Sequence, residues 1–180
     1  MNEGLIPRRY ATALFKVAAE RNDSERLYTM MQNVAAAFAG DADLQRVVAN
    51  PFVSDKDKIS LLTVAAGAES TDATYDDFLR LLSRNKRLDI MGAIARDYCL
   101  LYRRARNIRR VVVTSAAPLD DKSLDRLKKL IEDHLAGATM EFSSQVDPGL
   151  IGGFTVTVDN ERLDASVRNE LKQLRLNLLN

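Results

Sequence analysis

Five arginines fall within the eight residues 103–110. Guanidinium groups at this density can bind phosphates or an acidic partner. No aromatic residue interleaves them to stack on bases, and cations at the C-terminal end of a helix are also stabilised by the helix dipole. The cluster therefore favours a solvated helix end or a protein contact over nucleic acid.

Gly149–Gly152 reads Gly-Leu-Ile-Gly, which has the spacing of the GXXG loop that clamps a nucleic-acid backbone in KH domains. In KH domains this loop joins two helices. Here the middle pair is apolar and a predicted strand follows, so core or hinge packing is the favoured interpretation. An RNA-binding adaptor that uses this loop together with residues 103–110 stays open as the alternative function.

Residue types suited to catalysis or metal binding are sparse. His134 is the only histidine, which excludes a multi-histidine metal site, and its place near a helix C-terminus is more typical of electrostatic stabilisation than of catalysis. Cys99 is the single cysteine and lies in an apolar helical run, typical of a buried thiol. Adjacent acids such as Asp120-Asp121 open predicted helices, where they stabilise the dipole. No glycine-rich nucleotide motif occurs, so we expect no catalytic residue, cofactor or metal, and a small hydrolase lacks an acid–base pair.

The composition is that of an ordinary globular chain, with 180 residues, 46% hydrophobic and 28% charged, and a formal net charge of +1. This charge gives no reason to expect nucleic acid or an anionic membrane as a partner. No apolar run approaches the roughly 20 residues that span a bilayer, so we expect membrane association only through partners. The start of the chain does not resemble a transit leader, which favours a bacterial protein.

The first part of the chain shows helical periodicity throughout. Stop signals are Gly40, Asn50-Pro51 and Gly67, since proline restricts the residue before it and glycine commonly ends helices. The predicted helices begin near Ile6-Pro7, after Asp23-Ser24, at Asp41, at Ser54 or Asp55, at Thr74 and at Leu88, and the sixth runs to about Asn107. Residues 1–106 are therefore predicted to form a six-helix bundle.

Several of these helices carry more apolar residues than one buried stripe needs. We expect Phe78, Leu81 and Leu82 to point inward from the fifth helix. Val64 is one of the apolar residues of the fourth, and Phe15 lies beside the main stripe of the first. Such wide stripes have two explanations. The helices are buried on two sides within the bundle, or they leave a groove for a partner helix.

Residues 107–180 change pattern and predict a small α/β domain, joined to the bundle by a hinge near residues 105–108, so that the whole chain has an α+β fold. The predicted order is strand, helix, strand, strand, helix. The strands are centred on Val111–Val113, on Met140 and Phe142, and on Phe154–Val158, whose alternation predicts one apolar and one hydroxyl face. The intervening helix runs from Asp120 or Asp121 to Gly137, and the last helix carries Val167, Leu171, Leu174 and Leu178.

The stretch Val146–Arg168 concentrates turn and close-packing signals. Asp147-Pro148 is turn chemistry, Gly152-Gly153 allows another part of the chain to come close, and Asp164 is predicted to cap the last helix. We expect this stretch to be a folding hub, so that a bulky residue at either glycine loosens the domain. The residues expected to build it are Asp147, Pro148, Gly152, Gly153, Phe154, Asp164 and Arg168.

Ordered motifs along the whole chain carry a resemblance to a known family. They are Arg9-Tyr10-Ala11-x-Ala13-Leu14-Phe15, Asn50-Pro51, Phe78-x-x-Leu81-Leu82-x-x-Asn85-x-Arg87-Leu88, Ser115-Ala116-x-Pro118-Leu119, Val146-Asp147-Pro148-x-Leu150-Ile151-Gly152-Gly153-Phe154 and Asp164-x-Ser166-Val167-Arg168. With these motifs the chain resembles the delta subunits of F-type ATP synthases, called OSCP in mitochondria. It departs from them at Gly149, where serine or glutamate is usual, and at Ala165, where glycine is common.

The resemblance implies a non-catalytic stator subunit, one copy per complex, on the cytoplasmic face of the bacterial plasma membrane. In the family, the helical domain binds N-terminal helices of the alpha subunits and the C-terminal domain meets the b subunits of the peripheral stalk. The head then resists the torque of the proton-driven rotor. The alpha-subunit contact carries over to Tyr10, Ala11, Leu14, Phe15, Phe78, Leu82 and Arg87.

Overall fold

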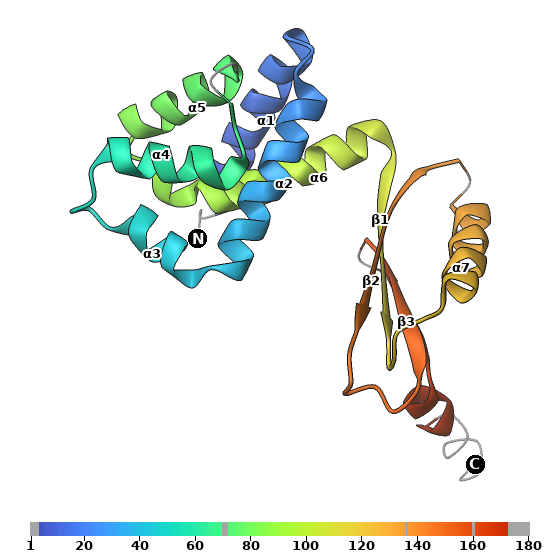
Figure 1. Cartoon of the computed structure of the whole chain (residues 1–180). Helices are drawn as coiled ribbons and strands as arrows, with labels where there is room; N and C mark the ends of the chain where they lie inside the picture. Colours follow the sequence, from blue (N-terminus) through green and yellow to red (C-terminus); the bar gives the residue numbers. More distant parts are fainter. Residues whose placement is uncertain (1–3, 70–71, 136, 160, 173–180) are drawn as a thin grey trace. The chain divides into compact units, whose positions relative to one another are not determined.

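The computed structural model describes residues 4–69, 72–135, 137–159 and 161–172 (Figure 1). The chain divides into two compact units, Met1–Ala105 and Arg106–Asn180. The described parts of the first unit are helical, and those of the second combine helical segments with a four-stranded sheet. The predicted combination of helices and strands in one chain is therefore confirmed.

The helices of the first unit begin and end at the local signals that the sequence carries. They are α1 (Leu5–Glu20), α2 (Ser24–Gly40), α3 (Ala42–Ala49), α4 (Asp55–Ala66), α5 (Ala73–Arg84), the short 3-10 turn η1 (Leu88–Ile90) and α6 (Met91–Arg106). Asp41 and Ser54 cap α3 and α4 by accepting hydrogen bonds from backbone amides. Gly67 ends α4 in the left-handed region.

Two tyrosines lie at the centre of the first unit. Tyr75 and Tyr98 are fully buried, and their hydroxyls donate to the carbonyl oxygens of Leu62 at 2.9 Å and Ser24 at 3.3 Å. Burial raises the pKa of both hydroxyls. Each ring therefore fills the core while its one polar atom remains hydrogen-bonded, which ties α5 to α4 and α6 to α2.

Two apolar positions of these helices are exposed, and one of them, Leu81, was predicted to point inward. Val64 on α4 is 77% exposed and Leu81 on α5 is 46% exposed. The helical period correctly places apolar residues on these helices, but the apolar arc of each helix is wider than the surface that its neighbours cover. Leu81 consequently borders an open groove rather than the core.

The second unit is built on a sheet with strand order β2-β1-β3-β4. Strand β1 (Ile108–Ser115) pairs in parallel with β2 (Thr139–Val146) and antiparallel with β3 (Gly153–Val158). The parallel pair requires a crossover, which α7 (Asp121–His134) provides, and α7 lies against one face of the sheet (Figure 1).

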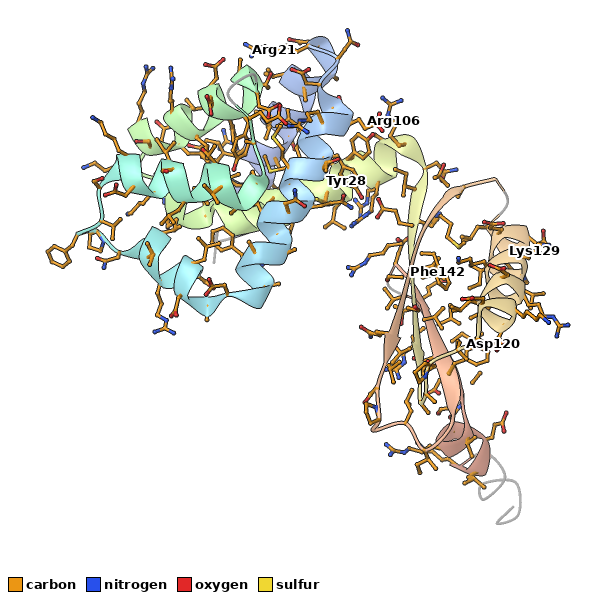
Figure 2. All side chains as sticks on the ribbon, in the orientation of Figure 1. Arg21, Tyr28, Arg106, Asp120, Lys129 and Phe142 are labelled. Atoms are coloured by element: carbon orange, nitrogen blue, oxygen red, sulfur yellow. The ribbon has the colours of Figure 1, made fainter. Side chains whose placement is uncertain are left out.

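The two faces of this sheet differ as the alternation predicts. Val111, Val113 and Val156 form the buried core on the side of α7, where the partly buried Leu127 and Ile131 of the helix pack against them. Phe142 of β2 packs there too (Figure 2), with the Lys128 ammonium 5.1 Å from its ring centre. The hydroxyls lie on the opposite face, where Thr114 accepts a 2.8 Å bond from an amide side chain of β2.

A fourth strand, β4 (Glu161–Ser166), was not predicted. It pairs antiparallel with β3, with Val158 opposite Glu161 and Gly153 opposite Ser166. Its sequence, Glu-Arg-Leu-Asp-Ala-Ser, lacks a β-branched or aromatic residue, because an edge strand needs few buried side chains.

The predicted capping role of Asp164 is wrong because this residue lies within β4. Its carboxylate accepts from the Ser166 amide at 3.0 Å, and this bonding to Ser166 lowers the pKa of the Asp164 carboxyl. Ser166 is the cap, since its hydroxyl accepts from the Asn169 amide at 3.3 Å. Residues 167–172 are helical, and the predicted helix positions Leu174 and Leu178 lie outside the described residues.

The glycine pair lies where β3, β4 and the last helix meet. Gly153 has φ +76°, and a Cβ there would collide with the carbonyl oxygen of Ala165 and come within 3.0 Å of Ser166 Cα. A Cβ at Gly152 would come within 3.1 Å of a Val167 methyl group, and the Gly152 carbonyl accepts from the Val167 amide. The close approach predicted for this pair is therefore present.

The loop before the glycine pair is a hydrogen-bonded turn. The Leu150 amide donates to the Asp147 carbonyl at 3.1 Å, which places Pro148 and Gly149 at the two central positions. The Asp147 carboxylate accepts from the Gly149 amide at 2.8 Å, and Arg168 donates to the Gly149 carbonyl at 3.1 Å. The turn is thus tied to the last helix, and the half-buried Phe154 follows it in β3.

Candidate protein-binding groove

Helices α1 and α5 form an open apolar groove of about 150 Å³ on the first unit. Its lining consists of five apolar side chains, one tyrosine and three polar residues: Tyr10, Ala13, Leu14, Val17, Arg21, Thr74, Asp77, Phe78 and Leu81. Leu14 and Phe78 are buried, whereas Val17 and Leu81 stay partly exposed. Exposed apolar side chains gathered around one groove indicate a surface that another apolar element covers.

The end of the groove near the start of α1 is closed by aromatic contact. The rings of Tyr10 and Phe78 meet edge to face, with their centres 6.4 Å apart. The Tyr10 hydroxyl accepts a 3.1 Å hydrogen bond from the amide side chain of Asn85, which directly follows α5. The start of α1 is therefore fixed beside the end of α5, and the two helices run antiparallel.

The other end is polar. Arg21, at the end of α1 (Figure 2), donates to the Thr74 hydroxyl at 3.2 Å and to the Asp77 carboxylate at 3.3 Å. The Thr74 hydroxyl in turn donates to Asp23 at 2.8 Å. Asp23 occupies the N-cap position of α2, but its side chain makes no capping bond there. This carboxylate joins α2 to α5, and the groove is held at both ends by side-chain hydrogen bonds.

A second polar cluster anchors the chain just before α5. The Asp72 carboxylate accepts from the Glu69 amide at 2.7 Å and from the Arg26 guanidinium at 3.2 and 3.1 Å. Hydrogen bonding from Arg26 lowers the pKa of the Asp72 carboxyl. It outweighs the burial of this carboxyl, which by itself would raise the pKa. The entry to α5 is thus fastened to α2, so that one wall of the groove is firmly positioned.

The residues expected to contact a partner helix do not lie together. Tyr10, Leu14 and Phe78 line the groove. Ala11 and Leu82 belong to the buried core and have no exposed surface. The helical period alone does not separate these two groups, because neighbouring positions on one apolar arc point toward the core and toward the groove.

Phe15 and Arg87 do not line the groove. The Phe15 ring packs edge to face on Tyr98 with 5.9 Å between ring centres, so it contributes to packing against α6. Arg87 is exposed and follows α5 by three residues, near the end of the groove that Asn85 closes.

Six lining residues were not predicted as contacts. They are Ala13, Val17 and Arg21 on α1 and Thr74, Asp77 and Leu81 on α5. The members of each set are spaced three or four positions apart, which puts them on one helix face. The signal that could have identified them is the extra apolar width of both helices, continued along the face that carries Tyr10 and Phe78.

The arginine cluster is partly used inside the protein. The Arg103 guanidinium lies 5.6 Å from the ring centre of Tyr28, which itself stacks on Tyr102 at 4.2 Å. Arg109 forms a 2.9 Å salt bridge with Asp159. The Gly149–Gly152 loop joins β2 to β3 and not two helices, so the comparison with a KH loop is wrong.

In the part of the chain that the structure covers, no three histidine, cysteine or acidic side chains gather as metal ligands would. None of the described helices is both long and apolar enough to cross a membrane.

A helical unit with an apolar groove, followed by a small sheet unit, defines a class of two-part interaction proteins. The family model of the ATP synthase delta (OSCP) subunit matches residues 6–178. The chain is 37% identical over 179 residues to ATP synthase subunit delta of Parabacteroides distasonis, covering 99% of this chain and 98% of that protein. Subunit delta of Methylobacterium sp. strain 4-46 is 32% identical, covering 96% and 90%.

A solved structure has the same fold. A chain of the Toxoplasma gondii mitochondrial ATP synthase hexamer matches with a TM-score of 0.73 and 23% identity, covering 97% of each chain. The protein belongs to the ATP synthase delta (OSCP) subunit family. It is accordingly a non-catalytic component of the stator, or peripheral stalk, of an F-type ATP synthase.

Proposed function

We propose that this subunit connects the catalytic head to the peripheral stalk through two separate surfaces. The groove between α1 and α5 receives an N-terminal helix of an alpha subunit, and the second unit binds the b subunits. The head then resists the torque of the proton-driven rotor during ATP synthesis. The observation that carries this proposal is the apolar groove, whose lining is incompletely covered by the chain itself.

The size of the groove suits a single helix. Its lining extends along α1 from Tyr10 to Arg21, which at 1.5 Å per residue is about 16 Å, or three helical turns. An amphipathic partner would place apolar residues at helical spacing against Val17, Leu81 and Phe78. Burial of the partly exposed Val17 and Leu81, together with the apolar side chains of the partner helix, supplies the driving force.

The second unit offers apolar surface around the glycine pair. Ile151 is 70% exposed, and Val146, Val167 and Leu171 are also exposed. The amide of Val167 is bonded to Gly152, so the loop and the last helix lie together. We assign the b-subunit contact to this patch, because apolar side chains from three adjacent segments gather there.

The copy number and the location of the subunit belong to the same proposal. One copy serves each complex, and it sits on the cytoplasmic face of the bacterial plasma membrane, which it reaches through its partners. Its function needs no nucleic acid and no cofactor. Co-purification with the alpha and b subunits from membranes, followed by cross-link mapping, tests both the partners and the stoichiometry.

Leu81→Glu in the full-length subunit tests the groove. A charge at this position must be desolvated when an apolar helix docks, so binding of a synthetic alpha N-terminal peptide should weaken at least about thirtyfold. Leu100→Glu is the matched control, since Leu100 on α6 is 51% exposed and does not line the groove. Equal binding by both variants would refute the assignment of the groove.

Ile151→Glu tests the second surface. We expect b-subunit binding to weaken at least about tenfold while alpha-peptide binding is unchanged, because an exposed apolar contact becomes charged. Leu130→Glu, on the outer side of α7 and 64% exposed, is the control. If Leu130→Glu abolished b binding and Ile151→Glu did not, the contact would lie on α7.

A further inference from the structure

Charged residues are unequally divided between the two ends of the groove. Within four positions of Tyr10 or Asn85 the described chain carries five cations and one acid: Arg8, Arg9, Arg84, Lys86, Arg87 and Asp89. All five cations are exposed, and among the described residues no salt bridge joins any of them to an acid. This end is strongly basic.

The opposite end is acidic. Within four positions of Arg21 or Thr74 the described chain carries six acids and one cation. Arg21 is already paired with Asp77, and Asp72 is paired with Arg26 from just outside this range. Glu20, with its exposed side chain, adds to the remaining negative charge.

These two ends act as separate electrostatic sites. They are about 16 Å apart along α1, which is twice the screening length of about 8 Å at physiological ionic strength. A charge on a bound helix therefore responds to the nearer end. A helix bound with its charges reversed would place like charges together at both ends.

We propose that the groove selects a dipolar amphipathic helix and sets its direction, with the acidic end of the helix over Tyr10 and Asn85 and its basic end over Arg21 and Thr74. This inference rests on the proposed function of the groove and adds the polarity of its partner. Side-chain charges decide the direction, because the backbone dipole of the bound helix contributes only about half a unit charge at each end.

Two synthetic peptides with one apolar stripe and identical composition test the direction. One has glutamates in its N-terminal third and lysines in its C-terminal third, and the other has them exchanged. Each carries a nitroxide at its N-terminus, and paramagnetic broadening is recorded on the amides of the full-length subunit. The acid-first peptide should broaden residues around Asn85, and the exchanged peptide should broaden residues around Thr74.

The position of the broadening is the decisive readout, and not the affinity. The two peptides differ in intrinsic helix stability, since acids favour a helix N-terminus, and this difference alone changes their affinities. Broadening that stays at one end when the charges are exchanged, or that is equal at both ends, overturns the proposal. So does failure of both peptides to bind while the alpha N-terminal peptide still binds. If that peptide does not bind either, the proposed function of the groove fails as well.

Charge reversal in the protein gives an independent test. The double variant Arg84→Glu/Arg87→Glu should bind the acid-first peptide about tenfold more weakly at low salt, with the difference shrinking in 0.5 M salt. The matched control is Arg96→Glu/Arg104→Glu, which reverses two exposed arginines of α6 away from the groove. Equal weakening by both double variants would show a non-specific charge effect and overturn the proposal.

Discussion

The two units of this stator subunit are stabilised in different ways. Large side chains such as Tyr75, Tyr98 and Leu79 are fully buried in the first unit. Among the described residues of the second, the buried apolar residues are Val111, Val113 and Val156, and no residue of α7 is fully buried. A small core provides less hydrophobic stabilisation, so the second unit depends more on its sheet hydrogen bonds and on close backbone approach.

This difference accounts for where the two proposed partner surfaces lie. The first unit is stable enough to leave an apolar groove between two helices that are fastened at both ends by side-chain hydrogen bonds. In the second unit the exposed Val146, Ile151, Val167 and Leu171 belong to the end of β2, the loop and the last helix that close the sheet. We therefore expect partner binding to stabilise the second unit more than the first.

The largest expected effect tests how far the second unit depends on the close approach of β3 to β4 at Gly153. Gly153→Ala should cost about 4 kcal/mol, because a Cβ collides with the Ala165 carbonyl and φ is positive. Gly137→Ala is the control, since Gly137 has φ +85° but no atom within 4 Å of a Cβ, and it should cost about 1 kcal/mol. Denaturant unfolding followed by amide signals of β1 measures both, and equal losses would contradict the role of close packing.

The next effect separates the core of the first unit from its groove. Leu82→Ala should cost about 3 kcal/mol because Leu82 is fully buried. Leu81→Ala, at the adjacent groove position, should cost below about 1 kcal/mol yet weaken binding of the alpha peptide. Thermal unfolding and peptide titration of both variants give the comparison. A large stability loss in Leu81→Ala would place this residue in the core after all.

The pH dependence of the first unit tests the cluster before α5. The folded state lowers the pKa of Asp72, so its charged form stabilises folding above the ordinary carboxyl pKa, and this contribution disappears as pH falls through the lowered value. Asp72→Asn should lower the melting temperature by about 3 °C at pH 7, and the difference should shrink as acidification protonates Asp72. Asp76→Asn is the charge-matched control, and an equal loss in it would point to net charge rather than to the Arg26 contact.

The smallest effect concerns the end of α5. Lys86 has φ +53°, a left-handed conformation that glycine adopts without strain. Lys86→Gly should therefore stabilise the first unit by about 0.5 kcal/mol. Arg84→Gly, within α5, should instead destabilise it by about 1 kcal/mol. Chemical denaturation measures both, and a loss of stability in Lys86→Gly would mean that its side chain makes a stabilising contact.

Local signals account for most of what the sequence predicted correctly. Ser54 and Gly67 mark the ends of α4 because capping and left-handed geometry act over a few residues. The alternation in β3 separates Val156 from Thr155 for the same reason. Strand β4 escaped prediction because its polar residues gain strand geometry from pairing with β3 and not from their own preference.

The candidate site was predictable only in part. The motif residues Tyr10, Leu14 and Phe78 line the groove, whereas Ala11 and Leu82 of the same motifs are core. The direct contact of these residues with an alpha helix stays a prediction. The arrangement of charge at the ends of the groove depends on the antiparallel placement of α1 and α5, which no local pattern specifies.

The sequence by itself determined the family of this protein, the helices of its first unit and the turn and glycine pair of its second, because these depend on residue types at short spacing. Tertiary structure alone decided which part of each wide apolar arc is covered. Helical periodicity marks a face but not what packs against it. Leu81 is left open because the neighbouring helices cover Leu82 and leave the groove beside α1 unfilled.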